Sequence, residues 1–179
     1  MRKLLSLIIA LSAIVLITGC SSHKQNVEPE KPQTTHLSNH DKYIKHNPFK
    51  LDKKQKALIE EALTWLGTPY KYAGDVKHKG TDCSGFTMKV YQNALDVAIP
   101  RNSAKQAEFC KHVDKKKLQP GDLVFFATGK SSSKVSHVGM MLTDEEFIHA
   151  SSSKGVVISR LDSPYYTRTY ISGGRVKHE

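Results

Sequence analysis

The order of apolar and polar positions divides the 179-residue chain into three parts. Residues 1–19 start with two basic side chains and continue as a mainly apolar run, which is typical of an export signal and too short for a spanning helix. Residues 20–50 are polar and contain prolines, so they predict a flexible tether. Residues 51–179 have periodic apolar positions and are long enough for one folded domain.

The first half of this domain has helical spacing. The predicted helices cover residues 52–67, 83–95 and 101–112. Asp52 is the expected N-cap of the first helix, and Gly67 is its expected terminator. The second helix starts near Cys83, and the third opens at Asn102 or Ser103.

After residue 112 the apolar pattern becomes that of strands, with short segments rich in β-branched and aromatic residues between turn residues. The predicted strands cover residues 122–128, 137–143, 146–151, 155–160 and 167–176. Helices followed by strands with short connections indicate an α+β fold with an antiparallel sheet.

The net charge of the chain limits the classes of partner that it is suited to bind. Without residues 1–19 it has 25 basic and 17 acidic groups, a net charge of +8. This charge suits an anionic cell-wall polymer or lipid headgroups. It does not suggest nucleic acid for an exported protein, and an ordinary solvated lysine-rich surface explains it as well.

The first of the three cysteines, Cys20, ends the stretch ITGC, which resembles a bacterial lipobox. Acylation of Cys20 would anchor the domain to a membrane through lipid. Ser21 follows the cysteine where aspartate would retain a lipoprotein in the inner membrane, so we expect the outer membrane, facing the periplasm. Cys83 and Cys110 either form a disulfide in this oxidising compartment, or Cys83 stays free for chemistry while Cys110 is buried.

Cys83 lies at an expected helix N-terminus, which lowers the pKa of a thiol and favours the nucleophilic thiolate. A general base is then needed, and histidine suits neutral pH. Of nine histidines, only His137 and His149 interrupt apolar strands. One such histidine is more often structural than catalytic. Two beside a helix-opening cysteine fit a nucleophile, a base and a group that orients the base.

Seven segments together resemble the NlpC-type cell-wall cysteine peptidases, in an order and spacing that cover essentially all of residues 55–176. The segments are YKYAG (70–74), KGTDCSGF (79–86), IPRNSAKQ (99–106), LQPGDLVFF (118–126), SHVGMML (136–142), FIHASSSKGVVIS (147–159) and SPYYTRTY (163–170).

The resemblance implies a papain-like fold that cleaves peptidoglycan stem peptides, without a metal or other cofactor, and we expect a monomer. Its catalytic triad falls on Cys83, His137 and His149, and its oxyanion-hole tyrosine on Tyr72. The residues it places near the substrate are Asp82, Ser84, Arg101 and Ser103. From its position alone, Asp82 is equally well explained as a helix cap.

Several alternatives stay open. Among relatives of this kind, the bond cleaved is either the cross-link between D-alanine and diaminopimelate, which we favour, or the bond between γ-D-glutamate and diaminopimelate. A wall-binding lipoprotein stapled by a Cys83–Cys110 disulfide would not be an enzyme. Cys83, His137 and His149 are also acceptable zinc ligands, although no close-spaced ligand pair supports a metal site.

Overall fold

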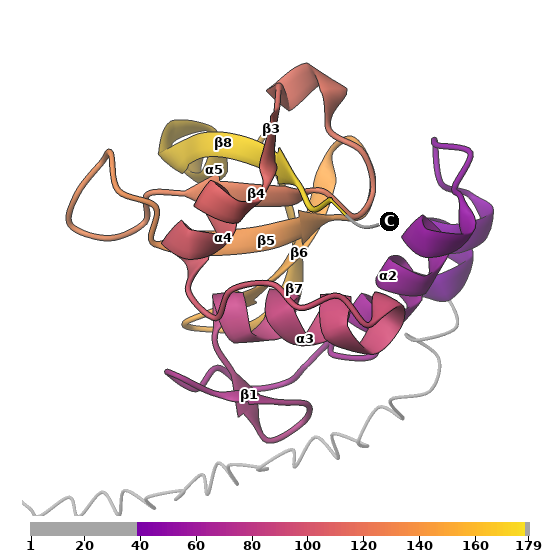
Figure 1. Cartoon of the computed structure of the whole chain (residues 1–179), viewed down its shortest axis with the longest axis horizontal. Helices are drawn as coiled ribbons and strands as arrows, with labels where there is room; N and C mark the ends of the chain where they lie inside the picture. Colours follow the sequence, from indigo (N-terminus) through magenta and orange to yellow (C-terminus); the bar gives the residue numbers. More distant parts are fainter. Residues whose placement is uncertain (1–38, 178–179) are drawn as a thin grey trace, which may run out of the picture. The chain divides into compact units, whose positions relative to one another are not determined.

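The computed structural model describes residues 39–177 (Figure 1). The predicted signal segment 1–19, the predicted lipidation site Cys20 and the first part of the predicted tether lie outside the described residues. Within residues 39–177, no helix has the length and apolar character needed to cross a membrane.

The domain is built around one antiparallel sheet of six strands in the order β3-β8-β4-β5-β6-β7 (Figure 1). Its strands are β3 (Lys111–Val113), β4 (Leu123–Phe126), β5 (His137–Met141), β6 (Glu146–Ser151), β7 (Gly155–Arg160) and β8 (Tyr170–Arg175). A separate two-stranded hairpin is formed by β1 (Asp75–Val76) and β2 (Gly80–Thr81). The prediction of an α+β fold with an antiparallel sheet is confirmed.

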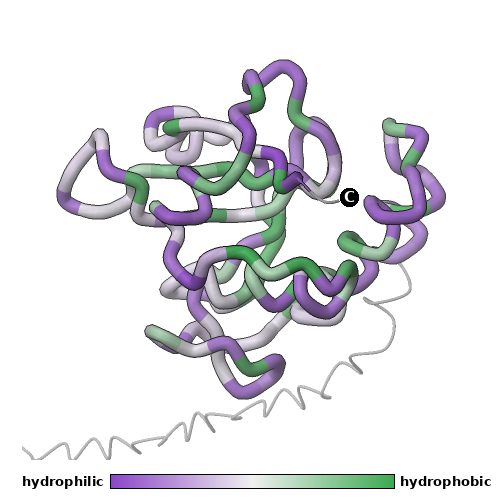
Figure 2. The backbone as a smooth tube through the Cα atoms, in the orientation of Figure 1, coloured by the Kyte–Doolittle hydropathy of each residue, from purple (hydrophilic) through white to green (hydrophobic). Residues whose placement is uncertain are grey.

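Both faces of the sheet are covered, as the central strand β4 shows. Leu123 and Phe125 belong to the larger core cluster, which the helices share, whereas Val124 and Phe126 belong to a second cluster. All four side chains are fully buried. Successive side chains of a strand point to opposite faces, so a strand covered on both faces is apolar throughout. Figure 2 shows the hydrophobic stretches of α3 and of the central strands.

Within residues 39–177, the α-helices that accompany the sheet are α2 (Lys53–Leu63), α3 (Cys83–Leu95), α4 (Ser103–Phe109) and α5 (Pro164–Thr169). The helix α3 packs against α2 and against β5 and β6. Asp52 caps α2 as predicted, and its carboxylate accepts a hydrogen bond from the Gln55 N–H at 2.7 Å. The side chain of Asn102 caps α4. A short helical turn, η2, covers Lys115–Lys117.

The prediction of a helix over 101–112 and of a strand over 167–176 is wrong at one end of each element. Cys110 has extended backbone, and the residues after it form β3, which pairs with β8. This edge strand has only three residues, too few for a visible period. Pro164 occupies the first position of α5, where its fixed φ suits a helix, so the strand begins only at Tyr170.

The packed domain also begins earlier than residue 51. A helical turn, η1 (Asp41–Lys45), brings Tyr43 into the core with 2% of its side chain exposed. Asn47 Nδ2 donates to the Leu142 carbonyl at 2.8 Å. The predicted tether therefore extends too far toward the domain, because a single aromatic residue in a polar stretch has no periodicity to reveal it.

Candidate active site

Cys83 is the first residue of α3, and Asp82 before it is the N-cap. The Asp82 carboxylate accepts a hydrogen bond from the Gly85 N–H at 2.7 Å, which fixes the start of the helix. A Cβ atom on Gly85 would lie 2.3 Å from the Gly74 carbonyl oxygen. Gly85 therefore lets the loop before the helix approach its first turn closely. The motif TDCSG therefore places the cysteine at the helix N-terminus through the Asp82 cap and the close approach at Gly85.

The two strand histidines form a hydrogen-bonded pair. His137 opens β5, and His149 lies in the adjacent strand β6 with 1% of its surface exposed. The His137 Nε2 and His149 Nδ1 atoms are 2.9 Å apart, and the rings are nearly perpendicular, at 89°. The antiparallel register of β5 and β6 brings together two residues that are twelve positions apart in the sequence.

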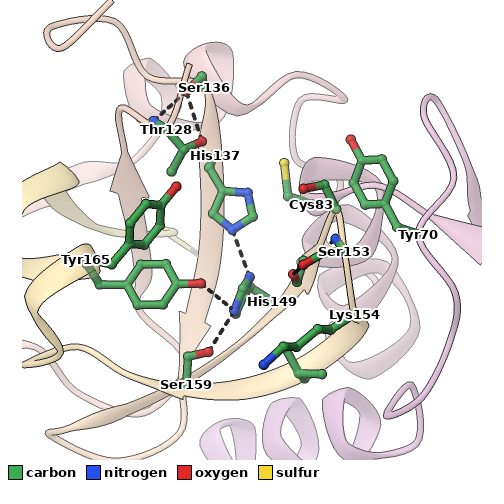
Figure 3. Close-up of a pocket in the computed structure, with 14 residues that line it drawn as sticks. Tyr70, Cys83, Thr128, Ser136, His137, His149, Ser153, Lys154, Ser159 and Tyr165 are labelled. Atoms are coloured by element: carbon green, nitrogen blue, oxygen red, sulfur yellow. Dashed lines mark hydrogen bonds between the residues drawn. The ribbon is translucent and has the colours of Figure 1, made fainter. Parts of the chain in front are cut away.

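Cys83, His137 and His149 line one cavity of about 450 Å³. The sulfur atom of Cys83 and the His137 ring face each other across it, and the nitrogen of His137 that does not contact His149 is on the side of the sulfur (Figure 3). The structure therefore brings together the three residues predicted as the triad, from α3, β5 and β6.

Cys83 is 9% exposed, and this burial raises the pKa of its thiol above the ordinary value. The backbone N–H groups of Val138, Ser84 and Cys83 itself lower the pKa, while the negative charge of Asp82 raises it. Burial outweighs the donors, so the expectation that the helix end ionises the thiol in the free protein is wrong. The resting group is a neutral thiol.

The histidine pair is neutral as well. Burial lowers the pKa of His137 to about 4. Burial, together with the nearby His137, lowers the pKa of His149 to about 3. No Asp or Glu side chain lies among the described residues that line this cavity, so no carboxylate there compensates for the lost hydration of an imidazolium. At neutral pH His137 is therefore a free base able to accept a proton.

The residues predicted near the substrate form a separate polar cluster. The Arg101 guanidinium donates to both carboxylate oxygens of Asp82 at 2.8 Å, and to the Ser84 hydroxyl at 3.0 Å. It also donates to the Gly74 carbonyl at 3.0 Å. Burial alone would raise the pKa of Asp82, but Arg101 and the N–H groups of Gly85 and Ala73 hold it below the ordinary value.

This cluster connects the loop before α3 to the start of the helix. Asp82, Ser84, Arg101 and Ser103 are absent from the lining of the cavity. The cap interpretation of Asp82 is confirmed. Ser103 is buried as the first residue of α4. A contact of any of the four with substrate stays a prediction.

The assignment of the oxyanion-hole tyrosine to Tyr72 is wrong. The Tyr72 side chain is 85% exposed and does not line the cavity. Tyr70 lines it instead, beside Cys83 (Figure 3). Both tyrosines belong to the same short loop, and the sequence alone does not reveal which of them turns toward the thiol.

The lining residues that the sequence did not indicate include Ser159, Tyr166 and Lys154. Ser159 and Tyr166 lie beside His149, and Lys154 follows the serines of the β6–β7 turn. Serine and tyrosine are too common for their identity to indicate a role. Val157 is the strand partner of His149, and Ser159 lies two residues beyond it on the same strand. Once the β6–β7 hairpin is predicted, this spacing indicates that Ser159 lies on the same face of the sheet near His149.

Two alternatives receive no support from the structure. Cys83 and Cys110 are both free, so the disulfide interpretation fails. Cys110 lies beside Gly174 on β8, and burial raises its pKa to about 12. Within residues 39–177, no three His, Cys, Asp or Glu side chains gather in a way that could hold a metal ion.

A cysteine at the N-terminus of a helix that packs on an antiparallel sheet carrying the histidines defines the papain-like class of α+β folds. The model of the NlpC/P60 family matches residues 67–175, and the chain belongs to this family. The recognised segments and the geometry of the site thus agree.

Named relatives are similar over nearly the whole chain. The Escherichia coli (strain K12) protein named "Probable endopeptidase NlpC" is 38% identical over 98% of this chain and 100% of its own length. The murein DD-endopeptidase MepS/murein LD-carboxypeptidase of the same strain is 31% identical over 98% of this chain and 94% of its own. A crystal structure of an NlpC/P60 family protein from Bacillus cereus has a TM-score of 0.63 and 38% identity, covering 68% of this chain and 39% of that one.

Proposed function

We propose that the protein is a cysteine endopeptidase that hydrolyses amide bonds of peptidoglycan stem peptides. One observation carries the proposal: the Cys83 thiol faces the His137 ring in an open cavity, while the other nitrogen of that ring is held by His149 at 2.9 Å. This arrangement contains a nucleophile, a base and a group that orients the base. The substrate class in the proposal comes from the similarity to a relative that is named a murein DD-endopeptidase.

The reaction begins from a neutral thiol and a neutral imidazole. His137 Nδ1 takes the thiol proton as the sulfur attacks the carbonyl carbon of the peptide bond. Because the pKa of the thiol is raised and that of His137 is lowered, transfer is unfavourable before substrate binds and must accompany the attack. A buried, uncharged site thus avoids a standing thiolate–imidazolium pair.

The attack forms a carbon–sulfur bond and places negative charge on the carbonyl oxygen. The backbone N–H of Cys83, at the first position of α3, has no partner within the helix and can donate to this oxygen. Tyr70 is the second donor in the proposal because it lines the cavity beside the sulfur. When the carbon–nitrogen bond breaks, the proton on His137 passes to the leaving amine.

A water molecule completes the cycle. His137 takes a proton from this water as its oxygen attacks the thioester carbon. The carbon–sulfur bond then breaks, His137 returns its proton to the departing sulfur, and the acid product releases its remaining proton to solvent as it becomes a carboxylate. His149 keeps His137 Nε2 in place during both halves. We favour the D-alanine–diaminopimelate cross-link as the bond cleaved, on the similarity to the murein DD-endopeptidase.

The location of the enzyme follows from the segments before the domain. A signal over residues 1–19 and a lipid on Cys20 would place the domain at the outer membrane, facing the periplasm. The net charge of +8 after removal of the signal favours adhesion to anionic wall polymer. In the proposal the domain acts as a monomer.

Digestion of purified peptidoglycan with the wild-type protein and with Cys83→Ser tests the function. We expect mass spectrometry to find new free amines on diaminopimelate and new D-alanine carboxyl ends with the wild type alone. New γ-D-glutamate carboxyl ends would assign the other bond. Identical fragments from the two proteins would remove the peptidase proposal.

A further inference from the structure

His149 has hydrogen-bond partners on both ring nitrogens. Its Nδ1 atom is 2.9 Å from His137, while its Nε2 atom is 3.0 Å from the Ser159 hydroxyl and 3.1 Å from the Tyr166 hydroxyl (Figure 3). The Tyr166 ring also packs edge-on against the His149 ring. Both hydroxyls lie where they can accept a hydrogen from Nε2.

The proposed chemistry requires one particular placement of the ring hydrogens. A neutral imidazole has one N–H and one bare nitrogen. His137 can accept the thiol proton only if its Nδ1 atom is bare, so its hydrogen must be on Nε2. That hydrogen is donated to His149 Nδ1, which must be bare in turn, and His149 then carries its hydrogen on Nε2.

We propose that Ser159 and Tyr166 are positioning residues, whose hydroxyl oxygens accept the His149 Nε2 hydrogen and so hold both imidazoles in the tautomer that leaves His137 Nδ1 free. Loss of one hydroxyl weakens the hold on the Nε2 hydrogen, and loss of both leaves a buried N–H without an acceptor, at a cost of about 1–3 kcal/mol. His149 would move its hydrogen to Nδ1 and donate it to His137 Nε2. His137 would then carry its hydrogen on Nδ1 and lose the bare nitrogen that faces Cys83.

Nitrogen NMR of the histidine rings tests this directly, because protonated and bare ring nitrogens have different shifts. In the Ser159→Ala/Tyr166→Phe protein we expect both rings to change tautomer, and kcat to fall about 10²- to 10⁴-fold with KM unchanged. Ser159→Thr keeps a hydroxyl and should keep both the tautomer and the rate. The rate readout rests on the proposed function, whereas the NMR readout does not.

Unchanged tautomers in the double variant would overturn the proposal, whatever the rate does, because a lower rate would then reflect a structural role. Circular dichroism checks that the variant folds. If the double variant does not fold, Ser159→Ala and Tyr166→Phe singly should each give a mixture of tautomers. Wild-type shifts in both single variants would also overturn the proposal.

A second inference rests on the charge of the cavity. Apart from the titrating thiol and imidazoles, Lys154 is the only charged group among the described residues that line it. Lys154 takes part in no ion pair found within residues 39–177. It follows three consecutive serines, Ser151 to Ser153, which also line the cavity. A lone cation with neighbouring hydroxyls is suited to an anion.

The turn that carries Lys154 is held in place by backbone contacts. The Val156 N–H donates to the Thr68 carbonyl at 2.8 Å, and the Gly67 N–H donates to the Val156 carbonyl at 3.0 Å. Gly155 has a φ of +71°, and a Cβ atom there would lie 2.3 Å from the Thr68 oxygen. Its lack of a side chain lets the turn lie against the α2–α3 connection.

We infer that Lys154, with the serines before it, forms a subsite for a carboxylate of the peptide that is cleaved. This inference deepens the proposed function by naming the group that the cavity selects. It is tested with two synthetic peptides that differ only in having a free or an amidated carboxylate next to the scissile bond. We expect a kcat/KM about tenfold higher for the free carboxylate, through KM, a preference worth about 1.4 kcal/mol.

Lys154→Met should remove this preference, Lys154→Arg should retain it, and Lys111→Met, on the exposed edge strand β3, should behave as wild type. Equal rates for the two peptides with the wild type, or a preference kept in Lys154→Met, would overturn the subsite alone. If the wild type cleaves neither peptide, the function fails. Calorimetric binding of the same peptides to Cys83→Ala, with and without Lys154→Met, then still decides the subsite.

Discussion

The two walls of the cavity are stabilised by different kinds of interaction. On the helical side, Asp82 and Arg101 form a bidentate, charge-assisted pair that fixes the loop and the first turn of α3. On the sheet side, His137, His149 and the hydroxyls beside them form a chain of neutral groups. Fixed charges provide rigidity where the nucleophile must be placed, and neutral groups allow protons to move where the base acts.

The charged pair is also kept out of the cavity. Arg101 binds both oxygens of the Asp82 carboxylate, and the negative charge of Asp82 raises the pKa of Cys83 less than burial does. A carboxylate in direct contact with His137 would instead raise the pKa of that base. The Asp82–Arg101 pair therefore stabilises the start of α3, whereas His137 and His149 provide the base and the group that orients it.

The sharpest test of the comparison removes the nucleophile. Cys83→Ser should lower the rate of peptide hydrolysis by about 10⁴-fold or more, because an alcohol is far less acidic than a thiol and His137 is a weak base. The rate is measured by release of new termini, with circular dichroism as the check on folding. Cys110→Ala is the matched control, since Cys110 lies outside the cavity lining, and it should retain the wild-type rate.

The loop before α3 carries two tyrosines, of which Tyr70 lines the cavity and Tyr72 is exposed at the surface. Tyr70→Phe should lower kcat about 100-fold, the usual result of removing one oxyanion donor. Tyr72→Phe should leave kcat unchanged, because its side chain is 85% exposed. Steady-state kinetics on one peptide measure both. A large loss of kcat in Tyr72→Phe and none in Tyr70→Phe would assign the oxyanion donor to Tyr72 and contradict the conformation of this loop.

Stability should depend on the charged wall. Arg101→Met leaves the Asp82 carboxylate, whose side chain is 11% exposed, without its cation. Breaking a fully buried pair costs about 3–5 kcal/mol, and the 38% exposure of Arg101 reduces this to about 2 kcal/mol. Urea unfolding measures it. Asp82→Asn/Arg101→Met should be less destabilised than Arg101→Met, and a larger loss in the double variant would contradict the pair.

The neutral wall should make the free energy of unfolding depend on pH. His137 and His149 have folded pKa values of about 4 and about 3, below the ordinary histidine value of 6.5. Between pH 6.5 and pH 4 the unfolded chain therefore binds more protons than the folded protein. The stability contribution of the two histidines is complete above pH 6.5 and is lost as the pH decreases. The slope is about 1 kcal/mol per pH unit for each histidine.

His149→Gln should remove one histidine's share of this slope. Urea unfolding of the wild type and the variant at pH 7, 6 and 5 measures the difference. Parallel curves for the two proteins would show that His149 is protonated equally in the folded and unfolded states, contrary to its burial.

Local patterns in the sequence identified much of the fold. The caps at Asp52 and Asn102, the helix that opens at Cys83 and the central strands all follow from spacing and side-chain type. Two elements without a recognisable apolar pattern were not predicted. The strand β3 has only three residues, and η1 depends on the contact of Tyr43 with the core of the domain that follows it. Such segments are ordered by distant contacts rather than by local preference.

For the site, the sequence by itself determined the thiol, the two histidines and their order along the chain, because helix starts and apolar strands are short-range features. Only the tertiary structure decided which loop tyrosine faces the thiol, which hydroxyls contact His149, and that Cys83 is neutral at rest. Those properties depend on burial and on strand register between distant segments. Desolvation by the whole fold outweighs the local donors of a helix end, and no short motif records it.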